Sequence, residues 1–171
     1  MAKITFILGG ARSGKSSYAE QLARQIRRPR IYIATAEALD EEMQVRIAEH
    51  RRRRGDDWTT LEVPLAIAEI IQNPSHKKSL ILVDCLTLWL SNLMRHGLDI
   101  TAQSQALTEA LQSTQARVIL VSNEVGQGIV PDNPLARRFI DRTGILHQQV
   151  AAVAGRVVWV AAGVPTIIKG K

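Results

Sequence analysis

An eight-residue glycine-rich segment is the clearest chemical signal in the sequence. Residues 9–16 read Gly-Gly-Ala-Arg-Ser-Gly-Lys-Ser, which matches the pattern G-x-x-x-x-G-K-[ST] of a phosphate-binding loop. Its glycines let backbone N–H groups wrap closely around phosphate oxygens, and a following helix adds positive potential at its N-terminus. We expect Lys15 to contact the terminal phosphates of a nucleotide and Ser16 to place its hydroxyl on Mg²⁺. The segment therefore predicts a nucleotide-binding site.

A carboxylate follows a second apolar run. Residues 80–83 read Leu-Ile-Leu-Val, and Asp84 comes directly after them. In phosphate-loop enzymes an acid at the end of a neighbouring strand helps to hold the metal, so Asp84 is our second candidate Mg²⁺ ligand. The alternative is that Asp84 caps the helix expected to follow, and the two roles could coexist.

A histidine next to four arginines is the third candidate. His50 precedes Arg51, Arg52, Arg53 and Arg54 at the end of a stretch that has the pattern of a helix. Such a group could hold the phosphates of a nucleotide while the imidazole attacks phosphorus. A histidine on an apolar helix face and a solvated helix end would show the same pattern, so spacing alone leaves both interpretations open.

The segment 122–131, Ser-Asn-Glu-Val-Gly-Gln-Gly-Ile-Val-Pro, combines an acid with two glycines after a strand. Because it would lie at the active edge of the sheet, it could be a functional loop, although a flexible connection is equally compatible with it. The single cysteine, Cys85, has no neighbour that would stabilise a thiolate, so we interpret it as a small buried side chain. His76, His96 and His147 lack the spacing of metal ligands, and we expect surface or structural roles for them.

Strands and helices must alternate to position these groups. Apolar, β-branched-rich runs predict buried strands at 4–8, 31–34, 80–83, 118–121 and 157–161. Helical patterns lie between them, at 17–26, 41–54, 65–72, 86–95, 102–113 and 135–154. Such alternation favours an α/β fold with a mostly parallel central sheet flanked by helices, and residues 166–169 could add an antiparallel edge strand. Ligands of such sheets bind at the carboxyl ends of the strands.

Length and composition limit the number of domains, the class of partner and the location that we expect. A chain of 171 residues without repeats or linkers predicts one domain over 1–171, so any two activities must share one core. The net charge of +6 suggests anionic partners such as nucleotides, phosphorylated metabolites or nucleic acid. No apolar stretch is long enough for a membrane span. The single cysteine and the lack of a signal-peptide pattern lead us to expect a cytoplasmic protein.

An ordered set of five segments runs along nearly the whole chain. The set consists of Gly-Gly-Ala-Arg-Ser-Gly-Lys-Ser at 9–16, Tyr-Ile-Ala-Thr-Ala at 32–36, Arg-Ile-Ala-Glu-His-Arg at 46–51, Trp-Thr-Thr-Leu-Glu at 58–62, and the loop at 122–131. Together they closely resemble the bifunctional adenosylcobinamide kinase/adenosylcobinamide-phosphate guanylyltransferase family of cobalamin biosynthesis. This set is far more specific than a phosphate loop alone.

The resemblance implies roles that spacing could not assign. It implies a RecA-like phosphate-loop fold, a homotrimer, and His50 as the residue that becomes covalently guanylylated. With Lys15, His50 would be catalytic. The implied nucleotide contacts are Gly9, Gly10, Ala11, Arg12, Ser13, Gly14, Lys15, Ser16, Ala34, Thr35, Ala36, Arg51, Arg52, Arg53, Arg54, Glu62 and Asp84.

Two reactions are implied, with Mg²⁺ as the cofactor. The terminal phosphoryl group of ATP or GTP first passes to the hydroxyl of adenosylcobinamide. His50 then attacks the α-phosphorus of GTP and transfers GMP to adenosylcobinamide phosphate, giving adenosyl-GDP-cobinamide. Asp84 and Glu124 are both conceivable bases for the kinase step.

Some features depart from the family pattern, and other functions remain conceivable. Asp84 stands where the family resemblance leads us to expect glutamate in some relatives, and His147 stands where we expect asparagine in many relatives. The second departure leaves the contribution of the helix of His147 to corrinoid binding open. A kinase without the covalent step is one alternative. A basic RecA-like ATPase that binds nucleic acid is another, which the short chain and the lack of an aromatic base platform disfavour.

Overall fold

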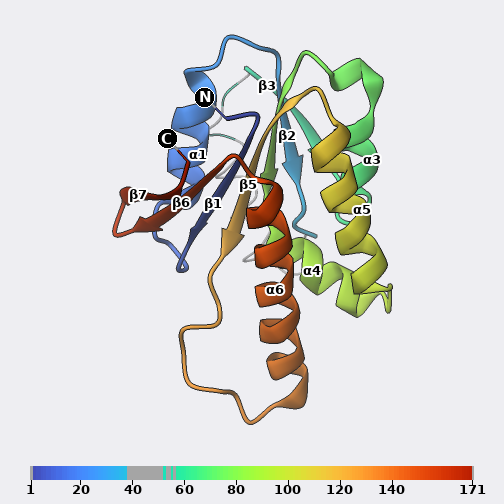
Figure 1. Cartoon of the computed structure of the whole chain (residues 1–171), viewed down its shortest axis with the longest axis vertical. Coiled ribbons are helices and arrows are strands. Elements are labelled where there is room, and N and C mark those ends of the chain that lie inside the picture. The colour runs from blue at the N-terminus through green and yellow to red at the C-terminus, as the bar shows by residue number, and fades with distance from the viewer. Residues whose placement is uncertain (1, 38–51, 53–54, 56, 171) are drawn as a thin grey trace.

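The protein is a layered α/β structure built on one sheet (Figure 1). The computed structural model describes residues 2–37, 52, 55 and 57–170. The described strands are β1 (Ile4–Gly9), β2 (Arg30–Ala34), β3 (Trp58–Glu62), β4 (Leu80–Asp84), β5 (Arg117–Asn123), β6 (Arg156–Ala161) and β7 (Val164–Lys169). The described helices are α1 (Lys15–Arg24), α3 (Ile67–Gln72), α4 (Leu86–Arg95), α5 (Ile100–Ser113) and α6 (Pro134–Val153), with a short 3₁₀ helix at Pro74–His76.

The described strands form a seven-stranded sheet in the order β3-β2-β4-β5-β1-β6-β7. All neighbouring pairs are parallel except β6 and β7, which are antiparallel. This confirms the expected mostly parallel sheet with an antiparallel C-terminal strand. Because parallel strands share a direction, the carboxyl ends of β1, β2, β3, β4 and β5 lie at one edge, where ligands bind in such folds.

Two buried apolar layers hold the helices against the sheet. On one face, Phe6 and Val83 pack with α3, α4, α5 and α6 around the fully buried Trp89. On the other face, Ile7 and Leu82 pack against α1. Successive residues of a strand point to opposite faces, so strands that are apolar at every position are what a sheet covered on both sides requires.

The strand β3 was not expected from the sequence. Its burial alternates poorly, with Trp58 buried and Glu62 exposed, because it lies at the edge of the sheet and pairs only with β2. Helix 41–54, by contrast, cannot be compared with the structure, since apart from Arg52 those positions lie outside the described residues. Within the described part of the chain, no helix is long and apolar enough to cross a bilayer.

Candidate active site at the carboxyl edge of the sheet

The glycine-rich segment forms a loop between β1 and α1, as its motif predicts. Gly9 ends β1, where an added Cβ would lie 2.2 Å from the carbonyl oxygen of Val160, so only glycine allows β1 and β6 to approach this closely. Gly14 precedes α1 with φ 97°, a left-handed conformation that glycine adopts without strain. As the N-cap, it provides no side chain to accept from the amides of the first turn, which leaves the positive end of α1 directed at the loop.

Lys15 is folded into this loop. Its side chain is buried, and the ammonium Nζ donates to the carbonyl oxygen of Gly10 and to Oγ of Ser13, the latter at 3.5 Å. The loop carbonyl and hydroxyl thus hold the ammonium among the backbone groups that would surround a phosphate. Ser16 follows in the first turn of α1, half-buried. The loop therefore has the form needed for phosphate binding, and the individual contacts remain predictions.

Parallel register brings three further candidate residues to the same edge. Ala34 at the end of β2 pairs with Glu62 of β3 on one side and with Asp84 of β4 on the other. Three residues that are far apart in the sequence thus lie side by side at the ends of three neighbouring strands. Glu62 is exposed, Asp84 is half-buried and Ala34 is buried.

Asp84 is held by a tyrosine rather than used as a helix cap. The hydroxyl of Tyr32 donates to Asp84 Oδ2 at 3.0 Å. Cys85, not Asp84, is the N-cap of α4, and it makes no side-chain cap hydrogen bond, so the capping alternative for Asp84 is wrong. The described residues contain no group of three or more His, Cys, Asp or Glu side chains that could hold a metal alone. An acid and a serine hydroxyl are nevertheless the oxygen donors that Mg²⁺ takes together with nucleotide phosphates, so Asp84 and Ser16 fit that ion.

Thr35 ties the ends of β2 and β4 together. Its fully buried Oγ1 accepts from the amide of Cys85 and donates to the carbonyl oxygen of the same residue, both at 2.8 Å. The backbone oxygen of Thr35 accepts from Asn92 Nδ2 at 2.7 Å, and its amide donates to the backbone carbonyl oxygen of Asp84 at 3.3 Å. The structure thus gives Thr35 a positioning role next to Asp84, and its expected nucleotide contact stays a prediction.

The expected nucleophile cannot be placed relative to this edge. His50, Arg51, Arg53 and Arg54 lie outside the described residues, and of the cluster only Arg52 is described, as an exposed helical residue. Of the remaining candidates, Ala11 and Arg12 are exposed in the phosphate loop, and Ala36 follows Thr35 half-buried. The roles proposed for all of them remain predictions.

The segment after β5 is anchored to the phosphate loop. The amide of Glu124 donates to the carbonyl oxygen of Gly9 at 2.9 Å, and Glu124 Oε1 accepts from the amide of Gly126 at 2.5 Å. The beginning of the segment is therefore held in place, whereas residues 126–130 are exposed. The functional-loop interpretation gains support from this anchor, because it fixes a carboxylate beside the nucleotide-binding loop.

A buried histidine of α6, His147, reaches the same edge. From the sequence we expected a surface or structural role for it and noted that it departs from the family pattern. His147 Nε2 is 2.8 Å from Oγ of the fully buried Ser122, and its ring contacts Phe6 edge-on, with centroids 5.5 Å apart. Burial lowers the pKa of His147 below its ordinary value, and the nearby Glu124 carboxylate opposes that shift only in part. The ring is therefore neutral at neutral pH. The sequence signal was its place among the buried positions Thr143, Leu146 and Val150 of α6.

Cys85 is buried and its thiol is unreactive, as expected. Its Sγ is 3.1 Å from Oγ1 of Thr87, which also accepts from Asn123 Nδ2 at 3.1 Å. Desolvation, followed by the negative charge of Asp84, raises the pKa of the thiol to about 11. A thiol with that pKa is protonated at neutral pH and is not a nucleophile.

Structural comparison finds the same α/β fold in other solved structures. The chain is similar to the flagellar accessory protein FlaH of Methanocaldococcus jannaschii, with a TM-score of 0.54 and 12% identity over 98% of this chain and 78% of the other. It is also similar to an ATPase of a bacterial type III secretion system, with a TM-score of 0.53 and 13% identity over 91% of this chain and 50% of the other. These likenesses support the α/β, RecA-like fold alone.

Sequence comparison identifies the family. A bifunctional adenosylcobalamin biosynthesis protein of Pseudomonas aeruginosa is 49% identical over 169 residues, covering 96% of each chain. Its counterpart in Escherichia coli is 39% identical over 178 residues, covering 95% of this chain and 98% of that protein. The family model described as cobinamide kinase / cobinamide phosphate guanyltransferase matches residues 5–168. Because both matches extend over nearly the full length, the chain belongs to the cobinamide kinase/cobinamide phosphate guanyltransferase family.

Proposed function

We propose that this protein phosphorylates adenosylcobinamide with ATP or GTP and then transfers GMP from GTP to the resulting adenosylcobinamide phosphate. The observation that carries the proposal is the family match over residues 5–168 together with a phosphate loop that lies at the same sheet edge as Glu62 and Asp84. The RecA-like nucleic-acid-binding ATPase is supported only by the shared fold and the net charge of +6, and nucleotide phosphates account for that charge equally well.

In the kinase step, the amides of the phosphate loop and Lys15 bind the transferring phosphoryl group and stabilise its charge. The acceptor oxygen attacks the γ-phosphorus, and the nucleoside diphosphate leaves. Asp84 and Ser16 would hold Mg²⁺, which neutralises phosphate charge when bound. The Tyr32 hydroxyl, 3.0 Å from Asp84 Oδ2, orients that carboxylate.

In the transferase step, neutral His50 attacks the α-phosphorus of GTP and pyrophosphate leaves. A phosphate oxygen of adenosylcobinamide phosphate then attacks the same phosphorus, the bond to histidine breaks, and adenosyl-GDP-cobinamide forms. The adjacent arginines would bind nucleotide phosphates and favour the neutral imidazole. This assignment rests on the resemblance of residues 46–51 to the family segment.

The test uses GTP labelled at the α-phosphate. Wild-type protein with Mg²⁺ should acquire acid-labile label and release pyrophosphate. His50→Ala should acquire none while still phosphorylating adenosylcobinamide, and His96→Ala, at an exposed histidine paired with Glu37, is the control. Label that persists in His50→Ala would refute the nucleophile. A wild type that phosphorylates the acceptor without ever being labelled would instead indicate the kinase-only alternative.

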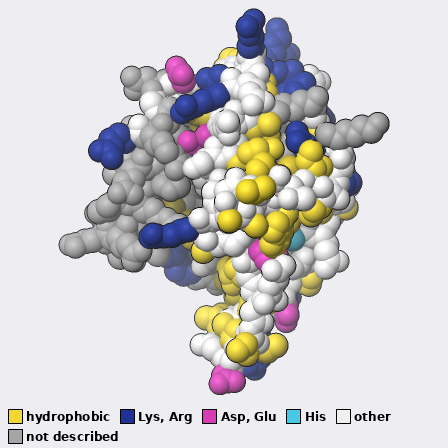
Figure 2. Space-filling view, turned by 90° about the vertical axis from the view of Figure 1, so that its left-hand side faces the viewer, with side chains coloured by type: hydrophobic (Ala, Val, Ile, Leu, Met, Phe, Trp, Pro, Cys, Tyr) yellow, Lys and Arg dark blue, Asp and Glu magenta, His cyan; other side chains and the backbone are white. Residues whose placement is uncertain are grey.

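We further propose that the protein is a homotrimer. A closed ring of three copies needs two different patches on each subunit that meet head to tail. Two separate exposed apolar patches support this arrangement: Val164, Ile167 and Ile168 on the fully exposed strand β7, and Ile129, Val130 and Leu135 around the start of α6. Figure 2 shows apolar side chains gathered in two regions of one face of the molecule, one near its middle and one at its lower end.

Light scattering after gel filtration tests the trimer. Wild-type protein should have about three times the mass of one chain, and Ile129→Asp or Ile167→Asp should each give smaller species, since both residues are exposed in the single chain. A monomeric wild type would refute the proposal. The cytoplasmic location stays a prediction.

A further inference from the structure

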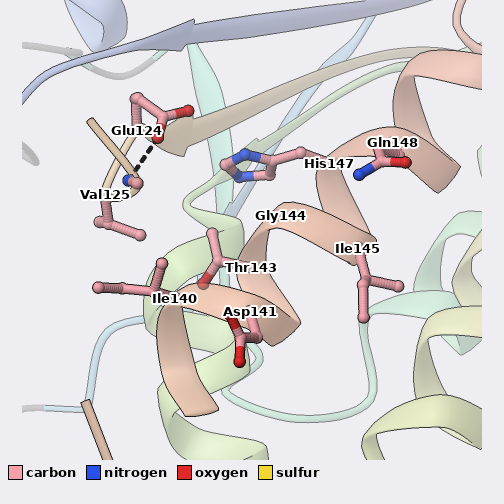
Figure 3. A pocket seen from close by; sticks show the side chains of 10 residues that line it. Glu124, Val125, Ile140, Asp141, Thr143, Gly144, Ile145, His147 and Gln148 are labelled. Atoms are coloured by element: carbon pink, nitrogen blue, oxygen red, sulfur yellow. Dashed lines mark hydrogen bonds between the residues drawn. The ribbon is translucent and has the colours of Figure 1, made fainter. Parts of the chain in front are cut away.

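A surface pocket lies between α6 and the segment that follows β5 (Figure 3). We call it the α6 pocket. It has a volume of about 530 Å³ and is lined by Glu124, Val125, Gly126, Ile140, Asp141, Thr143, Gly144, Ile145, His147 and Gln148. This volume suits a polar arm of a large molecule better than a whole corrinoid.

The α6 pocket adjoins the phosphate loop. Glu124 lines it, and the amide of Glu124 is bonded to Gly9, the first residue of that loop, at 2.9 Å. On the other side, His147 is bonded to Ser122, which pairs with Leu8 of β1. A group bound in the pocket therefore lies next to the site proposed for the transferring phosphates.

The charges in the α6 pocket exclude the nucleotide polyphosphate. Glu124 and Asp141 are the acids that line it, the described lining residues include no lysine or arginine, and burial keeps His147 neutral. An anion would be repelled there, whereas a neutral group with hydroxyls and amides would find hydrogen-bond partners. The pocket thus fits the acceptor and not the phosphate donor.

The Glu124 carboxylate is fixed and directed into the pocket. Its Oε1 accepts from the amide of Gly126, two residues further along the chain. This hydrogen bond fixes the carboxylate and therefore also the direction of its second oxygen. In Figure 3 that second oxygen and the His147 ring point toward one another from opposite walls.

We propose that the α6 pocket binds the hydroxyl-bearing arm of the corrinoid acceptor and that Glu124 is the catalytic base of the kinase step. This inference rests on the proposed function. As the hydroxyl oxygen bonds to the γ-phosphorus, the bond from that phosphorus to the bridging oxygen breaks and its electron pair leaves with the diphosphate. The hydroxyl proton passes to the Glu124 carboxylate and from there to water. Asp84, held by Tyr32 at the end of β4, is left to the metal.

The negative charge of Glu124 should affect the two reactions differently. The phosphorylated acceptor carries negative charge that Glu124 repels, so the product is driven away from the position where it formed. The phosphate oxygen that attacks in the GMP transfer is already anionic, so that step has no proton for Glu124 to remove. The kinase step should depend on this residue and the guanylyl transfer should not.

Glu124→Gln tests the base with little change in shape. The amide oxygen of glutamine can still accept from Gly126, so the loop is preserved. We expect kcat of adenosylcobinamide phosphorylation to fall by at least about 100-fold, as for loss of a general base, whereas transfer of GMP to supplied adenosylcobinamide phosphate changes less than about twofold. Glu109→Gln, at an exposed glutamate of α5, is the matched control. Kinase activity equal to that of the control would overturn the role of Glu124.

Gly144→Leu tests the pocket independently. Gly144 lines the pocket, and a Cβ at this position meets no atom within 4 Å, so a side chain can be attached there. Leucine also favours a helix more than glycine does. We expect the KM for adenosylcobinamide to rise at least about tenfold with ATP affinity unchanged. Ala152→Leu, at an exposed position of the same helix, controls for the added bulk.

A direct binding measurement distinguishes failure of the pocket assignment from failure of the proposed function. Adenosylcobinamide binding is measured by equilibrium dialysis in the presence of a non-hydrolysable ATP analogue, and we expect Gly144→Leu to weaken it about tenfold. If wild type binds and phosphorylates the acceptor but Gly144→Leu matches Ala152→Leu, only the pocket assignment is refuted. If wild type neither binds nor phosphorylates adenosylcobinamide, the proposed function fails as well.

Discussion

Thr35 provides a direct test of how the active edge is held together. Its Oγ1 is fully buried, accepts from the amide of Cys85 and donates to the carbonyl oxygen of Cys85, each at 2.8 Å. Thr35→Val replaces this hydroxyl with a methyl group of similar size. The variant therefore leaves no cavity and removes only the two hydrogen bonds.

The expected cost follows from what each partner loses. The carbonyl oxygen of Cys85 also accepts from the amide of Trp89 at 3.1 Å, so it keeps a partner and loses about 0.5–1.5 kcal/mol. The amide of Cys85 is left buried without an acceptor, which costs about 1–3 kcal/mol. Together they predict a loss of about 1.5–4.5 kcal/mol. Thr35→Ser keeps both bonds and loses one methyl group, about 1 kcal/mol.

Urea unfolding followed by circular dichroism measures the difference. Thr35→Val should unfold with a free energy at least about 0.5 kcal/mol below that of Thr35→Ser at an unchanged denaturant slope. If Thr35→Val proved as stable as Thr35→Ser, the hydroxyl would not be tying β2 to β4. The positioning role that we assign to Thr35 would then be wrong.

Three further predictions concern residues around the same edge. Tyr32→Phe removes the donor to Asp84 Oδ2 and should cost about 1.5–3 kcal/mol of unfolding free energy, measured in urea at pH 7; an unchanged value would contradict the hydrogen bond. Cys85, whose thiol pKa is raised to about 11 by burial, should resist an aromatic disulfide reagent at pH 8 until the protein is unfolded, and rapid reaction of the native protein would count against its burial. His147 has a pKa below its ordinary value in the folded state, so the unfolded chain binds more protons between the two pKa values and stability decreases as pH falls through that window. Wild type should thus lose more stability than His147→Gln between pH 7.5 and 5.5, and equal losses would refute this linkage.

The sequence was sufficient where one physical pattern dominates. The apolar run before Asp84 predicted β4, and the glycine motif with its Lys15 predicted the loop that the structure shows between β1 and α1. Strand β3 was missed, because the edge position of Thr59 and Thr60 leaves one side without a partner strand and weakens the buried-strand pattern.

Contacts between residues far apart in the sequence could not be predicted from local sequence patterns. The bonds from Thr35 to Cys85 and from His147 to Ser122 join residues 50 and 25 positions apart. The parallel pairing of β2 with β4 brings the first pair together, and the packing of α6 against the sheet brings the second pair together. The same is true of Glu124, which sequence reasoning offered beside Asp84 as a possible base. Its anchor on Gly9 and its place in the α6 pocket distinguish the two residues.

The family resemblance implies nucleotide contacts from residues 9–16, and from these we predict that one phosphate loop serves both reactions. Lys15→Ala tests it when phosphorylation of adenosylcobinamide and labelling of the protein by α-labelled GTP are measured on the same preparation, with Lys3→Ala, at an exposed lysine, as the control. We predict that both rates fall at least about 100-fold in Lys15→Ala and that neither changes in Lys3→Ala. Retention of either reaction at the wild-type rate in Lys15→Ala would show that the two activities use separate nucleotide sites and would contradict the account.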